Sequence, residues 1–249
     1  MGEYRDRLID TSISRALTTF GAVIIDGARA VGKTTTALHH SSSSVRLDAS
    51  PDISTLAATA PDVVLAGETP RLIDEWQLAP SIWNAVRHEV DLRTRPGQFI
   101  LTGSSTPADD LTRHSGAGRF RRLTLRPMSL AESGESTKTV QLGSLFDGGQ
   151  IAGLGGPSVA DYTNLIVRGG WPALVGDPTR SPTDYLSSYL DDVARTDLPA
   201  AGSPVDPIRM RALIRAIARN VASEISSTKL AAEAELDRVE LSAQSVRKY

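Results

Sequence analysis

The chain has 249 residues, of which 40% are hydrophobic, and it carries a formal net charge of −2. That length suffices for one or two domains with a sizeable core, and the near-neutral charge excludes bulk attraction to nucleic acid. The absence of cysteine excludes disulfides, thiolate nucleophiles and cysteine-ligated zinc. No apolar run approaches the roughly 20 residues of a membrane span, and the N-terminus lacks a signal-peptide pattern. We therefore expect a cytoplasmic protein with no membrane partner.

The first apolar run, residues 22–26 (AVIID), predicts a buried strand that ends at Gly27. A helix is predicted over residues 81–92, where Ile82, Val86 and Val90 recur at helical spacing. Further strands are predicted at residues 45–48, 71–75, 98–103 and 119–125. Strands alternating with helical segments are typical of an α/β fold with a parallel sheet, which we expect over residues 1–128.

The composition changes after Pro127. Gly, Ser and Thr accumulate there, which predicts a lid or linker over residues 129–182. A mostly helical domain is predicted over residues 183–249, with one helix starting at Asp206-Pro207. The expected buried stripe of that helix is Met210, Ile214, Ile217, Val221 and Ile225.

Residues 27–35 read GARAVGKTT and match the pattern G-x-x-x-x-G-K-[ST]. Gly27 and Gly32 permit a tight turn that points backbone N–H groups at phosphate oxygens. Lys33 would reach the β- and γ-phosphates of ATP, and the Thr34 hydroxyl would bind Mg²⁺. The alternative is a chance glycine turn, but the strand before it and the helix after it favour a phosphate cradle. The predicted nucleotide-binding residues are Gly27, Ala28, Arg29, Ala30, Val31, Gly32, Lys33, Thr34 and Thr35.

Two acids follow the predicted strand in RLIDEW. Asp74 and Glu75 would lie at the carboxyl end of a parallel strand, the edge where ligands bind in open α/β sheets. Asp74 is predicted to hold Mg²⁺ together with Thr34, and Glu75 to activate water as a general base. A solvated acidic pair is the alternative. The second acid favours a nucleotide hydrolase over a kinase, and the guanine-reading pattern N-K-x-D is absent.

Two further candidates lie beyond the second acid. Ser104 or Ser105, after the strand in FILTGSS, would contact the γ-phosphate or the attacking water, and we favour Ser104; ordinary turn serines are the alternative. Five arginines lie in residues 113–126, and we select Arg119 as an arginine finger that acts on a neighbouring subunit. This role implies a homo-oligomer. The alternatives are nucleic-acid contact and a solvated basic face.

Several segments, in their order along the chain, resemble the bacterial and archaeal AAA-type ATPases in which an AAA domain precedes a winged-helix-containing domain of unknown function. The segments are GARAVGKTT, LDASPD, RLIDEWQLAPSIWNAVR, GQFILTGSS, GAGRFRRLTLRPMSLAE and RGGWPAL. The resemblance implies an AAA+ sheet of strand order 5-1-4-3-2. It implies that Lys33 and Thr34 are Walker A residues, that Asp74 and Glu75 are Walker B residues and that Ser104 is sensor 1.

The same resemblance implies two features of the later chain. Gly170-Trp171-Pro172 matches a G-x-P element that brings Pro172 near the adenine, although the residues alone indicate only a turn. Family members continue beyond the winged helix, so a chain that stops at Tyr249 is expected to be C-terminally truncated. Residues 227–249 are typical of a helix-turn-helix, which makes DNA a candidate partner.

The leading hypothesis is Mg²⁺-dependent ATP binding and hydrolysis coupled to a conformational switch. The alternative is a nucleotide-gated DNA-binding module with little or no hydrolysis, in which Arg211, Arg215 and Arg219 contact the DNA. A kinase is a third interpretation.

Overall fold

The computed structural model describes residues 4–103, 116–149, 152–153, 155–197 and 206–248. The chain divides into two compact units, residues 1–179 and 180–249. The predicted lid or linker, residues 129–182, falls in the first unit as far as Thr179. The three-part division at residues 128 and 182 stays a prediction.

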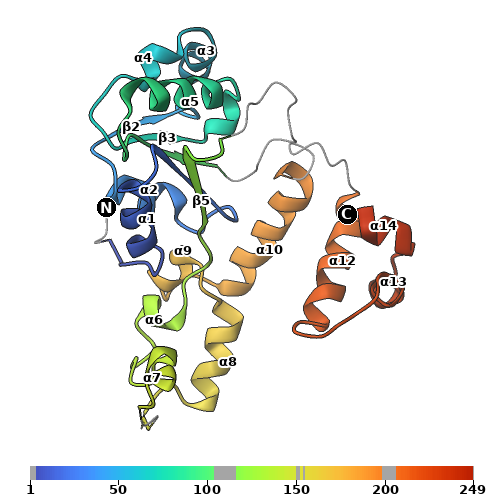
Figure 1. The fold of residues 1–249 in the computed structure, drawn as a ribbon. Coiled ribbons are helices and arrows are strands. Elements are labelled where there is room, and N and C mark those ends of the chain that lie inside the picture. The colour runs from blue at the N-terminus through green and yellow to red at the C-terminus, as the bar shows by residue number, and fades with distance from the viewer. Residues whose placement is uncertain (1–3, 104–115, 150–151, 154, 198–205, 249) are drawn as a thin grey trace. The chain divides into compact units, whose positions relative to one another are not determined.

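A five-stranded sheet forms the centre of the first unit (Figure 1). Its strands lie in the order β2-β3-β4-β1-β5, and every neighbouring pair is parallel. The predicted α/β class and the strand order 5-1-4-3-2 are confirmed. The strands are β1 (Ala22–Asp26), β2 (Ser43–Arg46), β3 (Arg71–Asp74), β4 (Phe99–Thr102) and β5 (Phe120–Thr124).

Strand β2 begins two residues before the predicted start at residue 45. Ser43 and Ser44 pair with Arg71 and Leu72 of β3, although neither serine is apolar. The strand lies at the edge of the sheet, where half of its side chains meet solvent, so polar residues are tolerated there. A search for apolar runs therefore places this strand too late in the chain.

Helices cover both faces of the sheet (Figure 1). Because side chains alternate along a strand, Val23 and Ile25 of β1 pack on one face and Ile24 on the other. The first face is covered by α1 (Asp10–Leu17) and α2 (Lys33–His39). The second is covered by α3 (Pro51–Thr59), α4 (Pro61–Leu65) and α5 (Ile82–Arg93). The result is a three-layer α/β/α core.

The register of the strands brings their carboxyl ends to one edge. Thr102 of β4 pairs with Ile25 of β1 on one side and with Asp74 of β3 on the other. The loop after β1 and the acids at the end of β3 therefore meet at that edge.

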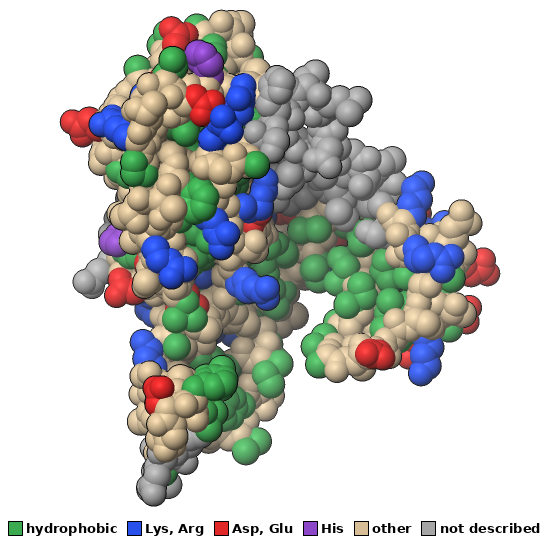
Figure 2. All heavy atoms as spheres, in the orientation of Figure 1, with side chains coloured by type: hydrophobic (Ala, Val, Ile, Leu, Met, Phe, Trp, Pro, Cys, Tyr) green, Lys and Arg blue, Asp and Glu red, His purple; other side chains and the backbone are tan. Residues whose placement is uncertain are grey.

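Short helices follow the sheet in the first unit: α6 (Leu130–Ser133), α7 (Leu142–Phe146), α8 (Val159–Arg168) and α9 (Pro172–Val175). Ser158 and Asp161 form a reciprocal capping box that starts α8. The apolar face of α8 is exposed, with Val159 at 85% and Ile166 at 80%. Figure 2 shows hydrophobic side chains gathered on the surface around α7 and α8.

The described part of the second unit is helical. Asp206 caps α12 by accepting hydrogen bonds from the backbone N–H groups of Ile208 and Arg209. No strand occurs among residues 206–248, so the wing of a winged helix is not found in that range. The elements are α10 (Pro182–Asp192), the π-helical turn η2 (Val193–Asp197), α12 (Pro207–Arg219), α13 (Ser227–Ala234), the 3₁₀ turn η3 (Glu235–Asp237) and α14 (Ala243–Lys248).

Of the predicted stripe of α12, only the first residue is fully buried and Ile214 is partly buried, while the rest of the prediction is wrong. Met210 is buried, but Ile217 is 49% exposed, and α12 ends at Arg219, before Val221 and Ile225. The buried face consists of Met210, Ala212, Leu213 and Ala216. The small alanines, like those buried on α13, permit close helix packing, and a search for large apolar residues misses them.

Candidate functional site

The loop between β1 and α2 has the backbone of a phosphate cradle. Gly27, Ala30 and Gly32 have φ angles of 139°, 61° and 97°. Left-handed residues interspersed in a turn direct successive N–H groups toward one concavity. A Cβ atom at Gly27 would collide with the carbonyl oxygen of Leu125, so the close approach of the loop to the end of β5 requires glycine.

Lys33 lies across this loop. Its Nζ donates to the carbonyl oxygens of Gly27 at 3.0 Å and Ala28 at 2.9 Å, and the residue is buried. Burial lowers the pKa of Lys33, while the nearby carboxylates of Glu75 and Asp74 act in the opposite direction. The ammonium thus sits at the loop with neutral oxygens as its hydrogen-bond partners. An anion in the loop would offer it a stronger partner.

The predicted metal-binding pair is brought together by the fold. Thr34 Oγ1 lies 2.9 and 3.1 Å from the two carboxylate oxygens of Asp74, which is 1% exposed. Thr102 also donates to Asp74, and the Arg46 Nε atom lies 3.7 Å away. The sequence interpretation missed both, although Thr102 ends the strand in FILTGSS and could have been noticed there.

This oxygen set suits a hard divalent cation. Mg²⁺ is usually held by one or two carboxylates, waters and substrate phosphates. Among the described residues, no group of three or more His, Cys, Asp or Glu side chains could hold a metal alone. Thr34 and Asp74 together therefore fit a magnesium ion that arrives with a nucleotide.

Glu75 follows Asp74 in a left-handed conformation, with φ of 57°, and precedes the 3₁₀ turn η1 (Trp76–Leu78). Its carboxylate accepts a hydrogen bond from Gln77 Nε2. Among the described residues, Gln77 Oε1 is buried without a hydrogen-bond partner, and a Cβ atom at Gly103 would collide with it. Gln77 thus connects the predicted general base to the end of β4. No sequence pattern signalled this residue.

Of the other two predicted catalytic residues, only Arg119 is described, and it is not joined to this cluster. Ser104 lies outside the described residues, so its sensor role stays a prediction. Arg119 immediately precedes β5, whose first residue pairs with Ala22, the first residue of β1. It therefore lies at the amino end of the sheet, opposite the phosphate loop. Its Nε donates to Asp91 at 2.7 Å, and a role on a neighbouring subunit stays a prediction.

A cavity of about 840 Å³ adjoins the loop. Pro172 lines it together with Gly32, and its Cγ lies 3.7 Å from the place a Cβ of Gly32 would take. Gly170 fixes this approach because its carbonyl accepts from Met128 N–H at 2.7 Å and a side chain there would strike the Met128 backbone. The cavity has the size of a small-molecule pocket.

The N-terminal segment supplies another wall of this cavity. Tyr4 and His39 both line it, and their rings stack with centroids 4.0 Å apart. The sequence interpretation missed this wall because Tyr4 lies outside every motif. The fold alone brings it to the end of α2.

In the second unit, the arginines predicted to contact DNA are engaged by carboxylates. Arg211 lies 2.8 Å from Asp191, and Arg215 lies 2.9 Å from Asp237. Arg219 lies 3.2 Å from both Glu233 and Asp237. The carboxylates neutralise the positive charge with which these arginines would bind DNA phosphates. The geometry therefore gives no support to the DNA-binding alternative.

Comparison with known proteins agrees with the α/β/α fold described for the first unit. Residues 19–134 match the AAA domain family, and residues 159–249 match a domain of unknown function (DUF8612). No curated protein matches the chain. A solved structure, C. elegans PCH-2, is similar at 14% identity and a TM-score of 0.26. The match covers 91% of this chain and 60% of that one, and so weak a likeness carries no argument.

The AAA match over residues 19–134 and the sheet order together support a nucleotide-binding domain of the ATPase type, followed by a helical part. Among the described residues, no helix is both long and apolar enough to cross a membrane.

Proposed function

We propose that the AAA domain binds ATP at residues 27–35 and hydrolyses it, with Glu75 as the general base. The observation that carries the proposal is the meeting of three features at the carboxyl edge of the sheet. These are the left-handed loop, the ammonium of Lys33 and the contact between Thr34 and Asp74. Together they fit a triphosphate accompanied by a divalent cation.

The phosphates would occupy the concavity of the loop, where Lys33 exchanges its bonds to the Gly27 and Ala28 carbonyls for bonds to phosphate oxygens. Thr34 and Asp74 would hold Mg²⁺, which neutralises charge on the phosphates when bound. The base would enter the 840 Å³ cavity beside Pro172.

In the chemical step, a water oxygen attacks the γ-phosphorus while the bond to the β,γ-bridging oxygen breaks. Glu75 accepts the proton of that water, and ADP and phosphate leave. The contact from Gln77 orients the Glu75 carboxylate. Hydrolysis would bias a conformational switch, and Arg119 of a second copy would complete the site in a homo-oligomer.

The test is phosphate release from ATP with Mg²⁺, together with equilibrium binding of ATP. We expect wild type to turn over and Glu75→Gln to bind ATP but release phosphate at least about 10²-fold more slowly, as for loss of a general base. Glu240→Gln, which changes an exposed carboxylate of the second unit, serves as the control and should match wild type. Equal rates for wild type and Glu75→Gln would contradict the proposed role of Glu75.

A further inference from the structure

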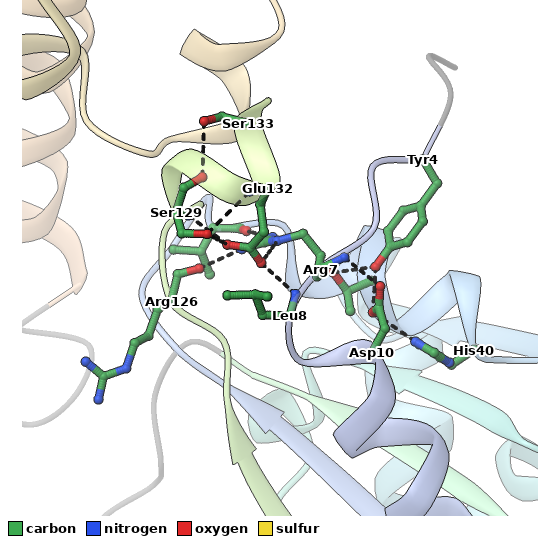
Figure 3. A network of polar contacts seen from close by, with 11 residues as sticks. Tyr4, Arg7, Leu8, Asp10, His40, Arg126, Ser129, Glu132 and Ser133 are labelled. Atoms are coloured by element: carbon green, nitrogen blue, oxygen red, sulfur yellow. Dashed lines mark hydrogen bonds and ion pairs between the residues drawn. The ribbon is translucent and has the colours of Figure 1, made fainter. Parts of the chain in front are cut away.

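Arg7 is the centre of a polar network beside the phosphate loop (Figure 3). Its guanidinium is buried and donates in three directions. Nη1 reaches the Val31 carbonyl at 3.0 Å, Nη2 reaches the Arg126 carbonyl at 2.7 Å, and Nε reaches Glu132 at 3.0 Å. One side chain thus joins the loop, the segment after β5 and the helix α6.

Glu132 balances the charge of Arg7. It also accepts hydrogen bonds from the backbone N–H groups of Leu8 at 2.8 Å and Ser129 at 2.7 Å. Burial raises the pKa of Glu132, but hydrogen bonds from Ser129, Leu8 and Arg7 outweigh it and hold the pKa below its ordinary value. The pair is therefore ionised and well satisfied, as a buried ion pair requires.

The bond to Val31 bears directly on the cradle. In a loop whose N–H groups point inward at a ligand, a buried carbonyl group needs a hydrogen-bond partner of its own. Val31 is fully buried, and Arg7 supplies the partner for its carbonyl. Arg7 Nη1 would also lie 3.4 Å from a Cβ of Gly32, so the arginine packs against two successive loop residues.

A second attachment holds the N-terminal segment in place. Asp10 accepts from the backbone N–H of Arg7 at 2.6 Å and from the Tyr4 hydroxyl at 2.8 Å, and it lies 3.0 Å from His40 Nε2. Residues 4–10 therefore contact the chain just before α2 begins and just after it ends.

We propose that Arg7 is a positioning residue of the nucleotide site, which fixes the phosphate loop in its binding conformation through Val31 and anchors it to Glu132. The inference rests on the proposed function, since it concerns the same loop. It predicts that lysine cannot replace Arg7, because one ammonium cannot serve three partners in the plane of a guanidinium.

The test compares Arg7→Lys with Arg71→Lys. Arg71 is a matched control because its side chain also donates to a backbone carbonyl, that of Val64 at 2.7 Å, but at the amino end of β3. For each variant we would measure the affinity for Mg-ATP, the hydrogen exchange of loop amides 27–34 and the melting temperature without nucleotide. The last separates general loss of stability from a local change in the loop.

Arg7→Lys is expected to lower ATP affinity by about 10-fold, within the usual range of coupling between sites, and to speed amide exchange in the loop. Arg71→Lys should change neither. Wild-type affinity and wild-type loop exchange in Arg7→Lys would overturn the inference while the proposed function stands. Failure of wild type to bind ATP would overturn both.

If Arg7→Lys does not fold, Glu132→Gln replaces it. This variant keeps the shape of the side chain but removes the charge that holds Arg7. ATP affinity should fall less than for Arg7→Lys, in the same direction, with faster loop exchange. Unchanged affinity and exchange in Glu132→Gln would overturn the inference.

Discussion

The phosphate loop and the helix α12 both present cations, but the two regions hold them by opposite means. Lys33 is buried and donates to two neutral carbonyl oxygens. Arg219 is partly exposed and lies between two carboxylates, Glu233 and Asp237. The cation with neutral partners keeps a charge that an incoming anion can use, whereas the cation between carboxylates serves the packing of its own unit. The partner of a cation, more than the number of cations, marks an anion site.

The largest expected difference between the two regions is in the rate of ATP hydrolysis when the cation of each is removed. Lys33→Ala should reduce phosphate release from ATP by about 10²–10³-fold, as expected when a donor to the developing charge is lost. Arg219→Ala should leave the rate at the wild-type value, because its charge is already compensated within the second unit. Assays with Mg-ATP at saturation would measure both. A large loss in Arg219→Ala would break the distinction between the two regions.

The backbone of the loop gives the next largest effect. Gly27→Ala combines a positive φ angle with a collision against the Leu125 carbonyl, while at Gly118, with a positive φ of 77°, a Cβ atom would meet no atom of the described residues within 4 Å. The strain of a side chain at positive φ, about 1–3 kcal/mol, is common to both. We expect Gly27→Ala to lower the free energy of unfolding in urea further than Gly118→Ala, and to weaken ATP binding. Equal losses would show that the loop can move away from β5.

The sequence was sufficient to predict the parts of the site that belong to short, continuous sequence patterns. Residues 27–35 and the acids Asp74 and Glu75 belong to short patterns, and a parallel sheet must bring the ends of their strands to one edge. The contact between Thr34 and Asp74 follows from that rule alone. The predicted strand order came from the family resemblance, because spacing does not determine which strands are neighbours.

The parts that escaped prediction depend on distant contacts. Arg7 and Glu132 are 125 positions apart, and only Glu132 lies in a segment that carries the family resemblance, so nothing in the sequence links the two. Arg119 was selected because it follows a predicted helix and leads into the predicted fifth strand, and the direction of β5 then puts it at the far edge of the sheet. The buried face of α12 was misplaced because alanines, such as Ala212 and Ala216, carry little hydrophobic signal.

Removing a carboxylate partner of the α12 arginines is expected to have a smaller effect, on the affinity for DNA. Asp237→Asn removes the carboxylate shared by Arg215 and Arg219. Binding of duplex DNA at low ionic strength should rise, and the dependence of log K on log salt should steepen by about 0.9 for each new phosphate contact. Glu224→Gln, an exposed acid of the same unit, is the control. If Asp237→Asn did not increase DNA affinity, ion pairing with carboxylates would not be the reason that these arginines do not bind DNA.

The smallest effect concerns the response of the two ion-pair clusters to pH and salt. Hydrogen bonds hold the pKa of Glu132 below its ordinary value of 4.5, and contact with Arg215 holds that of Asp237 below its ordinary value of 3.8. Each group therefore stabilises the fold fully above its unfolded-state pKa, and this contribution is lost as the pH falls through the lower folded-state value. Unfolding free energy should decline on acidification below about pH 4.5, and Glu132→Gln should flatten that decline.

Salt separates the two groups. At about 0.5 M NaCl, charges in solvent are screened within a few ångströms. Because Glu132 is buried against Arg7, its contribution to the acid-induced decline in unfolding free energy should persist at this salt concentration. The share of Asp237, whose arginine partners are solvent-exposed, should shrink, and Asp237→Asn should then alter the pH profile only at low salt. Urea unfolding of the three proteins across pH 3 to 7 at both salt concentrations would measure this. A salt-sensitive contribution from Glu132 would mean that water reaches the network around Arg7, and the loop would then lack the rigid support assigned to it.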